Sequence, residues 1–136
     1  RAGQRELFPD RKTLIDIALF EKRFDDAIAL YGEMGKERIA ALGLGRVVAR
    51  AVAKTHPEVA LAIWRGIVDR LIAETTPRAY TEAGTFLGQM RKVYEACGRE
   101  ADWQALLTEL RRTHRAKRRL QVVLDGLAGT GRKLVG

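Results

Sequence analysis

The chain has 136 residues, the length of one ordinary domain, so it can bury a hydrophobic core without the help of disulfides or a structural metal. Its single cysteine, Cys97, excludes an intrachain disulfide. The sequence has neither the apolar core of a signal peptide nor the run of roughly 18 apolar residues that a membrane span needs. We therefore expect a soluble, cytoplasmic protein. Lys and Arg number 25 against 17 Asp and Glu, a formal net charge of +8, and residues 77–136 hold 12 of these basic groups against 6 acidic ones.

Two short helices are predicted at the start of the chain. Asp10 can cap the first helix, and Gly35 is expected to end the second. Only residues 21–23 separate them, and so short a link predicts that the two helices fold back on each other as a hairpin. The apolar positions that carry these predictions are Leu14, Ile15, Ala18 and Leu19 in the first helix and Phe24, Ala27, Ile28 and Tyr31 in the second.

A third helical stretch, residues 37–54, contains two glycines. Gly43 and Gly45 each cost about 1 kcal/mol relative to alanine in a helix interior, so we expect a break or kink there.

The next helix is predicted over residues 57–74. Thr55 and Glu58 have the spacing of a helix start at which the hydroxyl and the carboxylate each accept a backbone N–H group. Its predicted buried residues are Ala60, Ile63, Trp64, Ile67 and Leu71.

The clearest helical periodicity follows. Thr76 can cap this helix with Pro77 at its first position, and Gly98 comes directly after its last periodic residue. The apolar positions, spaced three and four apart, are Tyr80, Ala83, Leu87, Met90, Tyr94 and Cys97. They predict one apolar face, and a buried, unreactive thiol at its end.

Two more apolar stripes complete the chain. They comprise Trp103, Leu106, Leu107 and Leu110, and then Leu120, Val123, Leu124 and Leu127. Continuing the first stripe would place His114 and Lys117 on the core face, so we expect a turn near residues 113–116, with one uninterrupted helix as the alternative. Residues 129–136 are rich in glycine and are expected to fray.

A loose repeat indicates how the helices assemble. Residues 24–31 and 57–64 are similar, and their aligned alanines, Ala27 and Ala60, are 33 residues apart. The first copy resembles the tetratricopeptide repeat, although Ile15 replaces the usual glycine and no proline closes the unit. We therefore predict an all-α fold, a right-handed stack of antiparallel helix hairpins with five to seven helices, forming one domain over residues 1–128.

A longer resemblance covers residues 56–127. The residues that carry it are His56–Pro57, Ala79–Ala83, Met90–Tyr94, Gly98–Arg99, Trp103 and Leu110–Arg118. In these positions the chain looks like the C-terminal helical region of bacterial proteins with SWIM-type zinc fingers. Such fingers bind zinc through three cysteines and a histidine, and this chain has one cysteine, so no zinc ligand is carried over. The resemblance implies that a separate finger accompanies the region in a longer protein, which also fits a chain that begins with Arg1.

The most conspicuous chemical feature is a run of six basic residues, Arg111, Arg112, Arg115, Lys117, Arg118 and Arg119. Guanidinium groups can bind phosphate with two hydrogen bonds, so the run could contact nucleic acid or another polyanion, and an acidic protein is a further possible partner. The alternative, and the commonest outcome for a basic run, is a solvated surface partly paired with Glu95, Glu100, Asp102 or Glu109. No aromatic side chain is interleaved for base stacking.

No pattern indicates an enzyme. The two histidines, His56 and His114, are 58 positions apart and have no metal-ligand spacing around them, and Asp25 and Asp26 are predicted to be helix-surface acids. We therefore predict no catalytic residue, metal, cofactor, small-molecule substrate or membrane contact. The preferred function is a non-enzymatic helical scaffold for protein–protein or intramolecular domain interaction, and the alternative is a basic module that contacts nucleic acid through residues 111–119.

Overall fold

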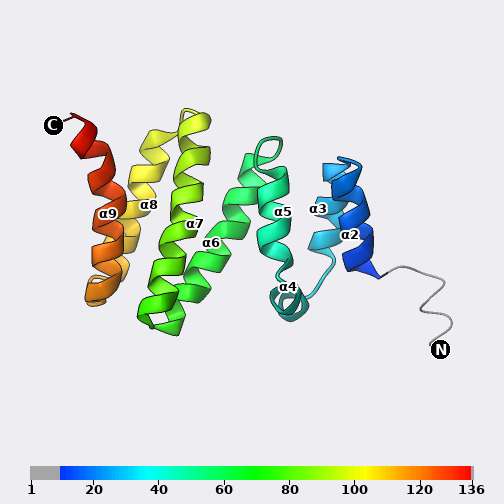
Figure 1. Ribbon diagram of the computed structural model, residues 1–136, viewed down its shortest axis with the longest axis horizontal. Coiled ribbons are helices and arrows are strands. Elements are labelled where there is room, and N and C mark those ends of the chain that lie inside the picture. Colours follow the sequence, from blue (N-terminus) through cyan, green and yellow to red (C-terminus); the bar gives the residue numbers. More distant parts are fainter. Residues whose placement is uncertain (1–9, 136) are drawn as a thin grey trace. The chain divides into compact units, whose positions relative to one another are not determined.

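The computed structural model describes residues 10–135, with side chains for all but residues 38, 40, 41 and 129–135 (Figure 1). The described residues form helices and no strand. The helices are α2 (Arg11–Phe20), α3 (Phe24–Gly32), α4 (Lys36–Leu42), α5 (Leu44–Val52), α6 (Pro57–Glu74), α7 (Pro77–Ala96), α8 (Glu100–Thr113) and α9 (Arg118–Val135). The all-α prediction is confirmed. With α4 and α5 counted as the two halves of the predicted broken helix, the described part has seven helices.

The helices divide into two compact units, one that ends at Ile63 and one that starts at Trp64. In the first unit, α2 packs against α3 and α5, and α5 also packs against α3 and α4. In the second unit, α7 packs against α8 and α9, and α8 packs against α9. The hairpin predicted from the short link at residues 21–23 is therefore confirmed, whereas the right-handed stacking and the single domain over residues 1–128 stay predictions.

Two predicted caps fix helix starts. The Oδ1 atom of Asp10 accepts the N–H of Thr13 at 2.9 Å at the start of α2. The Oγ1 atom of Thr76 accepts the N–H of Ala79 at 3.1 Å, and Pro77 is the first residue of α7. Each oxygen satisfies a backbone donor that has no partner inside its helix, which explains why the two helices begin at these residues.

The predicted cap of α6 is wrong. The hydroxyl of Thr55 donates to the carbonyl of Val52 at 3.4 Å, and the first backbone bonds of the helix go to the carbonyl of His56, from Val59 and Ala60. Proline is favoured at the first helical position, so Pro57 starts the helix. Thr55 then lies one residue too early to cap it.

Backbone at positive φ lies between helices at two glycines and at two other described residues. Gly43 has a φ of 65° and divides α4 from α5, which confirms the predicted break, while Gly45 is helical and buried in α5. Gly98 has a φ of 69° and follows α7, as predicted. Helix α3 ends at Gly32, three residues before the predicted Gly35.

The C-terminal helices meet at the predicted turn. Helix α8 ends at Thr113 and α9 begins at Arg118, so one uninterrupted helix is excluded. The helix bounds of α9 extend to Val135, and the frayed end expected over residues 129–136 stays a prediction. Glycine lowers helix propensity but does not forbid a helix. Extending a helix that has already formed avoids the unfavourable nucleation step.

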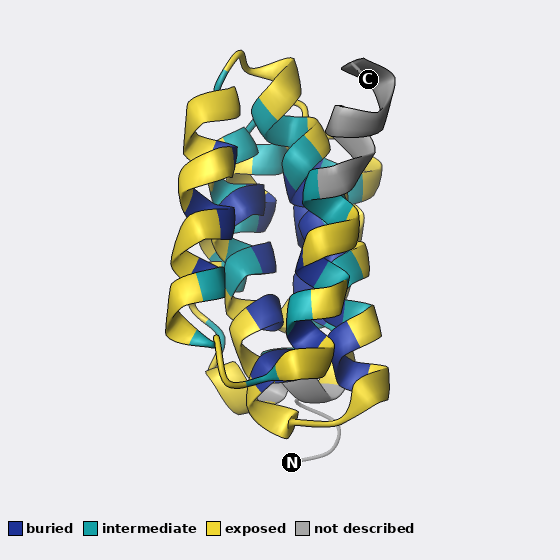
Figure 2. Cartoon of the chain, turned by 90° about the vertical axis from the view of Figure 1, so that its left-hand side faces the viewer, coloured by how far each residue is buried: buried dark blue, intermediate teal, exposed yellow. Residues whose placement is uncertain are grey.

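The core is made by the predicted apolar stripes. In the helices nearest the viewer in Figure 2, which belong to the second unit, buried positions lie on the sides that face neighbouring helices and exposed positions lie outward. The buried residues include Tyr80, Ala83, Leu87, Met90, Trp103, Leu106, Leu107, Leu110, Leu120 and Leu124. Among the described residues, no helix combines the length and the apolarity that a membrane crossing requires.

Some residues of the predicted stripes are half-buried or exposed. Cys97 is exposed, because it is the C-cap residue of α7, and the chain leaves helical geometry there before the stripe can continue. Ile63 is only half-buried, whereas Leu61, Val68 and Ile72 are buried in the same helix. The buried side of α6 is thus wider than the predicted stripe and rotated from it.

Candidate functional site

The six basic residues predicted as a site surround the junction of α8 and α9. Arg111 and Arg112 lie in the last turn of α8, Arg115 and Lys117 in the connecting turn, and Arg118 and Arg119 at the start of α9. The turn therefore gathers the cations at one end of a helix pair instead of spreading them along one helix.

The structure separates Arg111 from the other five. Its Nη1 atom lies 2.6 Å from Oδ1 of Asp125 on α9, so its charge is compensated and links the two helices. The others have no ion pair with any residue between 10 and 135; they are Arg112, Arg115, Lys117, Arg118 and Arg119, which we call the basic end. Four of their side chains are exposed, and that of Lys117 is half-buried.

The acids that could neutralise the basic end are mostly occupied by other arginines. The pairs are Arg91 with Glu95, Arg99 with Asp102 and Arg65 with Glu109, at 3.0, 2.7 and 3.2 Å. These three acids form their ion pairs with arginines outside the basic run, although the charge of Arg112 also acts on Glu109.

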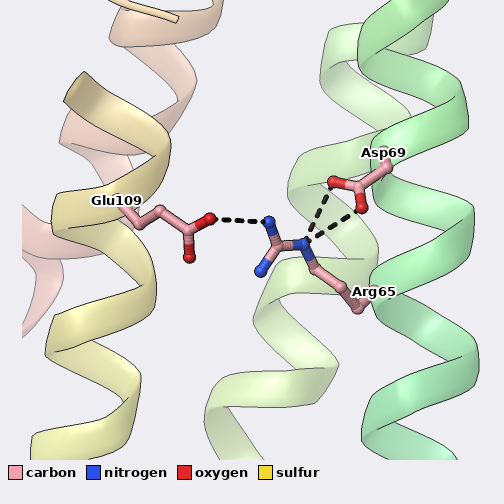
Figure 3. Close-up of polar contacts among 3 residues, drawn as sticks. All are labelled: Arg65, Asp69 and Glu109. Atoms are coloured by element: carbon pink, nitrogen blue, oxygen red, sulfur yellow. Dashed lines mark hydrogen bonds and ion pairs between the residues drawn. The ribbon is translucent and has the colours of Figure 1, made fainter. Parts of the chain in front are cut away.

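Arg65 connects α6 to α8 (Figure 3). Its Nε atom donates to Oδ1 of Asp69 at 3.0 Å, one turn along α6, and its Nη2 atom donates to Oε2 of Glu109 at 3.2 Å. The hydrogen bond and the positive charge of Arg65 hold the pKa of Glu109 below its ordinary value. Glu109 is thus a fixed negative charge beside the last turn of α8.

Replacing Arg65 with glutamine is expected to raise the pKa of Glu109 toward its ordinary value, because the variant loses the guanidinium charge that favours the carboxylate. A pH titration of the Glu109 carboxyl carbon by NMR measures the change. Because the pKa is lowered in the folded chain, the stabilisation from the pair is present at neutral pH and is lost as the pH falls through the lowered value. The control is Arg91→Gln, which breaks the pair with Glu95 and should leave the titration of Glu109 unchanged.

His114 belongs to the same group of charges. It is the first residue after α8, and its side chain is half-buried. Burial lowers its pKa, and the charge of Lys117 lowers it further, so the neutral ring is favoured at neutral pH. The His114 carbonyl accepts the Nε2–H of Gln121 at 2.9 Å, which holds the turn against α9.

A second polar group, in the first unit, was missed by the sequence analysis. The Nε2 atom of His56 lies 2.8 Å from Oδ1 of Asp25, 31 positions away, and its Nδ1 atom lies 2.9 Å from Oγ1 of Thr55. With Lys22, Arg23, Phe24 and Asp26, these residues line an open hollow of about 360 Å³. The repeat contained the signal, because Asp25 and His56 both lie near the starts of its two similar helices.

Comparison with known proteins gives no relative. No family model, curated protein or solved structure matches the chain. The resemblances to tetratricopeptide repeats and to the region beside SWIM fingers therefore stay predictions.

The order hydroxyl, imidazole and carboxylate at Thr55, His56 and Asp25 is also found in hydrolases, but the geometry here favours a structural role. The side chain of Asp25 is 92% exposed, so water competes for the contact and the ring is weakly oriented. The hydroxyl of Thr55 also has the carbonyl of Val52 as an acceptor. We interpret the group as a connection between the starts of α3 and α6. Within the described residues, no three His, Cys, Asp or Glu side chains are placed to hold a metal ion.

Proposed function

We propose that the protein is a non-enzymatic helical scaffold for contact with another protein or domain, and that the basic end is its contact surface. One observation carries the proposal: five cations lie around one helix junction and have no ion-pair partner in the described part of the chain. Like charges held close together repel each other, so a partner with the opposite charge stabilises them on binding. An acidic protein segment fits this surface.

Nucleic acid is the second candidate. Four of the five residues are arginines, whose planar groups can bind phosphates in pairs as well as carboxylates. However, the basic end has no aromatic side chain on which bases could stack, and Trp103, the nearest tryptophan in sequence, is 2% exposed. The lack of stacking groups disfavours single-stranded nucleic acid. Duplex phosphates need no stacking, so duplex DNA and RNA are the competing ligands in the test. A cytoplasmic location is part of the proposal and is supported by the single cysteine.

The test measures binding of polyglutamate and of generic duplex DNA and RNA across a salt series. The wild-type chain is expected to bind polyglutamate with an affinity that falls as salt rises, because screening weakens contacts between exposed charges. Substitution of four cations by glutamine is expected to weaken binding about tenfold or more, since rim charges contribute to affinity and association rate. The substitutions are Arg115→Gln, Lys117→Gln, Arg118→Gln and Arg119→Gln.

A matched control removes the same charge elsewhere. Arg50, Lys54, Arg78 and Lys92 are exposed and lie outside the basic end, and their replacement by glutamine should leave binding within about twofold if location rather than net charge matters. The proposal is overturned if the wild type binds no polyglutamate at low salt, or if the control weakens binding equally. Binding to DNA or RNA without binding to polyglutamate would establish the second candidate instead.

A further inference from the structure

We infer that His114 is part of the basic end and that binding of an acidic polypeptide there is coupled to uptake of a proton by its imidazole ring. The inference rests on the proposed function, since it requires an anionic partner at this surface. It adds a residue that the basic run does not include and a dependence on pH that arginine and lysine cannot provide, because they remain charged throughout the neutral range.

The backbone fixes His114 among the cations. The residue lies between Arg112 and Arg115 in the turn, and its carbonyl accepts the backbone N–H of Lys117 and the side-chain amide of Gln121, both at 2.9 Å. These two bonds tie the turn to the start of α9. The ring of His114 is half-buried and feels the charge of Lys117, so a partner bound over Lys117 changes the charges around the ring.

The charges around the ring come from three elements. Lys117 lies in the turn, Arg65 and Asp69 in α6 and Glu109 in α8. Gln121 of α9 is uncharged and contacts the backbone carbonyl of His114. Lys117 and Arg65 disfavour a protonated ring, and Asp69 and Glu109 favour it. Arg65 already binds both acids, so their negative charge is partly compensated where the ring lies.

The sign of the coupling follows from these surroundings. In the free protein, burial and then Lys117 lower the pKa of His114. A carboxylate chain bound over Lys117 adds negative charge beside the ring and raises that pKa again. Since the bound state then holds the proton more tightly, linkage requires the affinity for the polyanion to rise as the pH falls. An upward shift of one unit on binding corresponds to an affinity about tenfold higher once the ring is protonated.

The experiment measures the affinity of the full chain for polyglutamate at about pH 8 and about pH 6, a range in which glutamate carboxylates, with a pKa of about 4.3, stay ionised. Any titration of the polymer is common to all variants, so a pH dependence that is lost in His114→Gln is a property of the protein. The chain has two histidines, so His114→Gln is the test variant and His56→Gln the matched control. We expect the wild type and His56→Gln to bind several-fold and at most about tenfold more tightly at the lower pH, and His114→Gln to change less than about twofold.

A direct measurement keeps the inference testable if His114→Gln fails to fold. The ring C–H signals of His114 in the wild-type chain are titrated by NMR, free and saturated with polyglutamate, and the pKa is expected to be higher in the complex. An unchanged pKa, or a pH dependence that His114→Gln retains, overturns the coupling. Failure of the wild type to bind polyglutamate at either pH overturns the proposed function, so the two failures are distinguishable.

Discussion

Replacement of Leu87 by alanine is expected to destabilise the second unit by about 2–5 kcal/mol, one of the largest effects of any single truncation in the chain. Leu87 is 0% exposed and lies near the middle of α7, which packs against both α8 and α9. Truncation removes methyl groups that are buried in the core, so their contribution to burial is lost. It also leaves a cavity that the two packed helices cannot fully close. Urea unfolding, followed by circular dichroism, measures the loss.

The control for this prediction is Val122→Ala on α9. Val122 is 68% exposed, so its truncation should change the free energy of unfolding by no more than about 0.5 kcal/mol. Similar, small effects of the two substitutions would contradict the assignment of Leu87 to the core.

Most of the fold was predictable because the signals are local. A cap at Thr76, a proline at position 77 and a glycine at position 98 determine where α7 begins and ends, and each acts through the backbone of its own neighbourhood. The turn between α8 and α9 was predictable for a similar reason, because the apolar stripe stops where His114 would have to be buried. The failures at Thr55 and Cys97 are shifts of one residue at helix ends, where neighbouring residues compete to end the helix.

Of the candidate site, the sequence predicts which basic residues are present but not which acids they contact. The sequence shows six neighbouring cations, but it does not show that Arg111 is compensated by Asp125 or that Arg65 lies 44 positions before the acid it binds. Likewise, the contact between Asp25 and His56 spans 31 positions. These pairings depend on which helices become neighbours, which the apolar spacing within one helix does not specify.

Gly84 is a further feature that local patterns did not reveal. A Cβ atom at this position would lie 2.6 Å from Cγ1 of Val123, so α7 and α9 approach each other closely there. A glycine adds nothing to an apolar stripe, and its role becomes visible only when the partner helix is in place. Gly88, one turn later in the same helix, has no atom within 4 Å of the corresponding position.

Alanine is therefore expected to stabilise the chain at Gly88 but not at Gly84. Gly88→Ala should stabilise the chain by about 1 kcal/mol, the gain in helix propensity. Gly84→Ala should lose that gain and be about 1–3 kcal/mol less stable than Gly88→Ala, because the added methyl group overpacks the contact with Val123. Val123 is β-branched and in a helix, so its side chain has little freedom to rotate away. Urea unfolding of both variants measures the difference.

A double-mutant cycle identifies the cause. Val123→Ala removes the methyl groups that the new side chain would meet, so Gly84→Ala should be far less harmful in that background, with a coupling of about 1 kcal/mol or more between the two positions. The same cycle with Gly88→Ala should show additive effects. If Gly84→Ala changes the free energy of unfolding by the same amount with valine and with alanine at position 123, the two helices do not approach each other as closely as the contact requires.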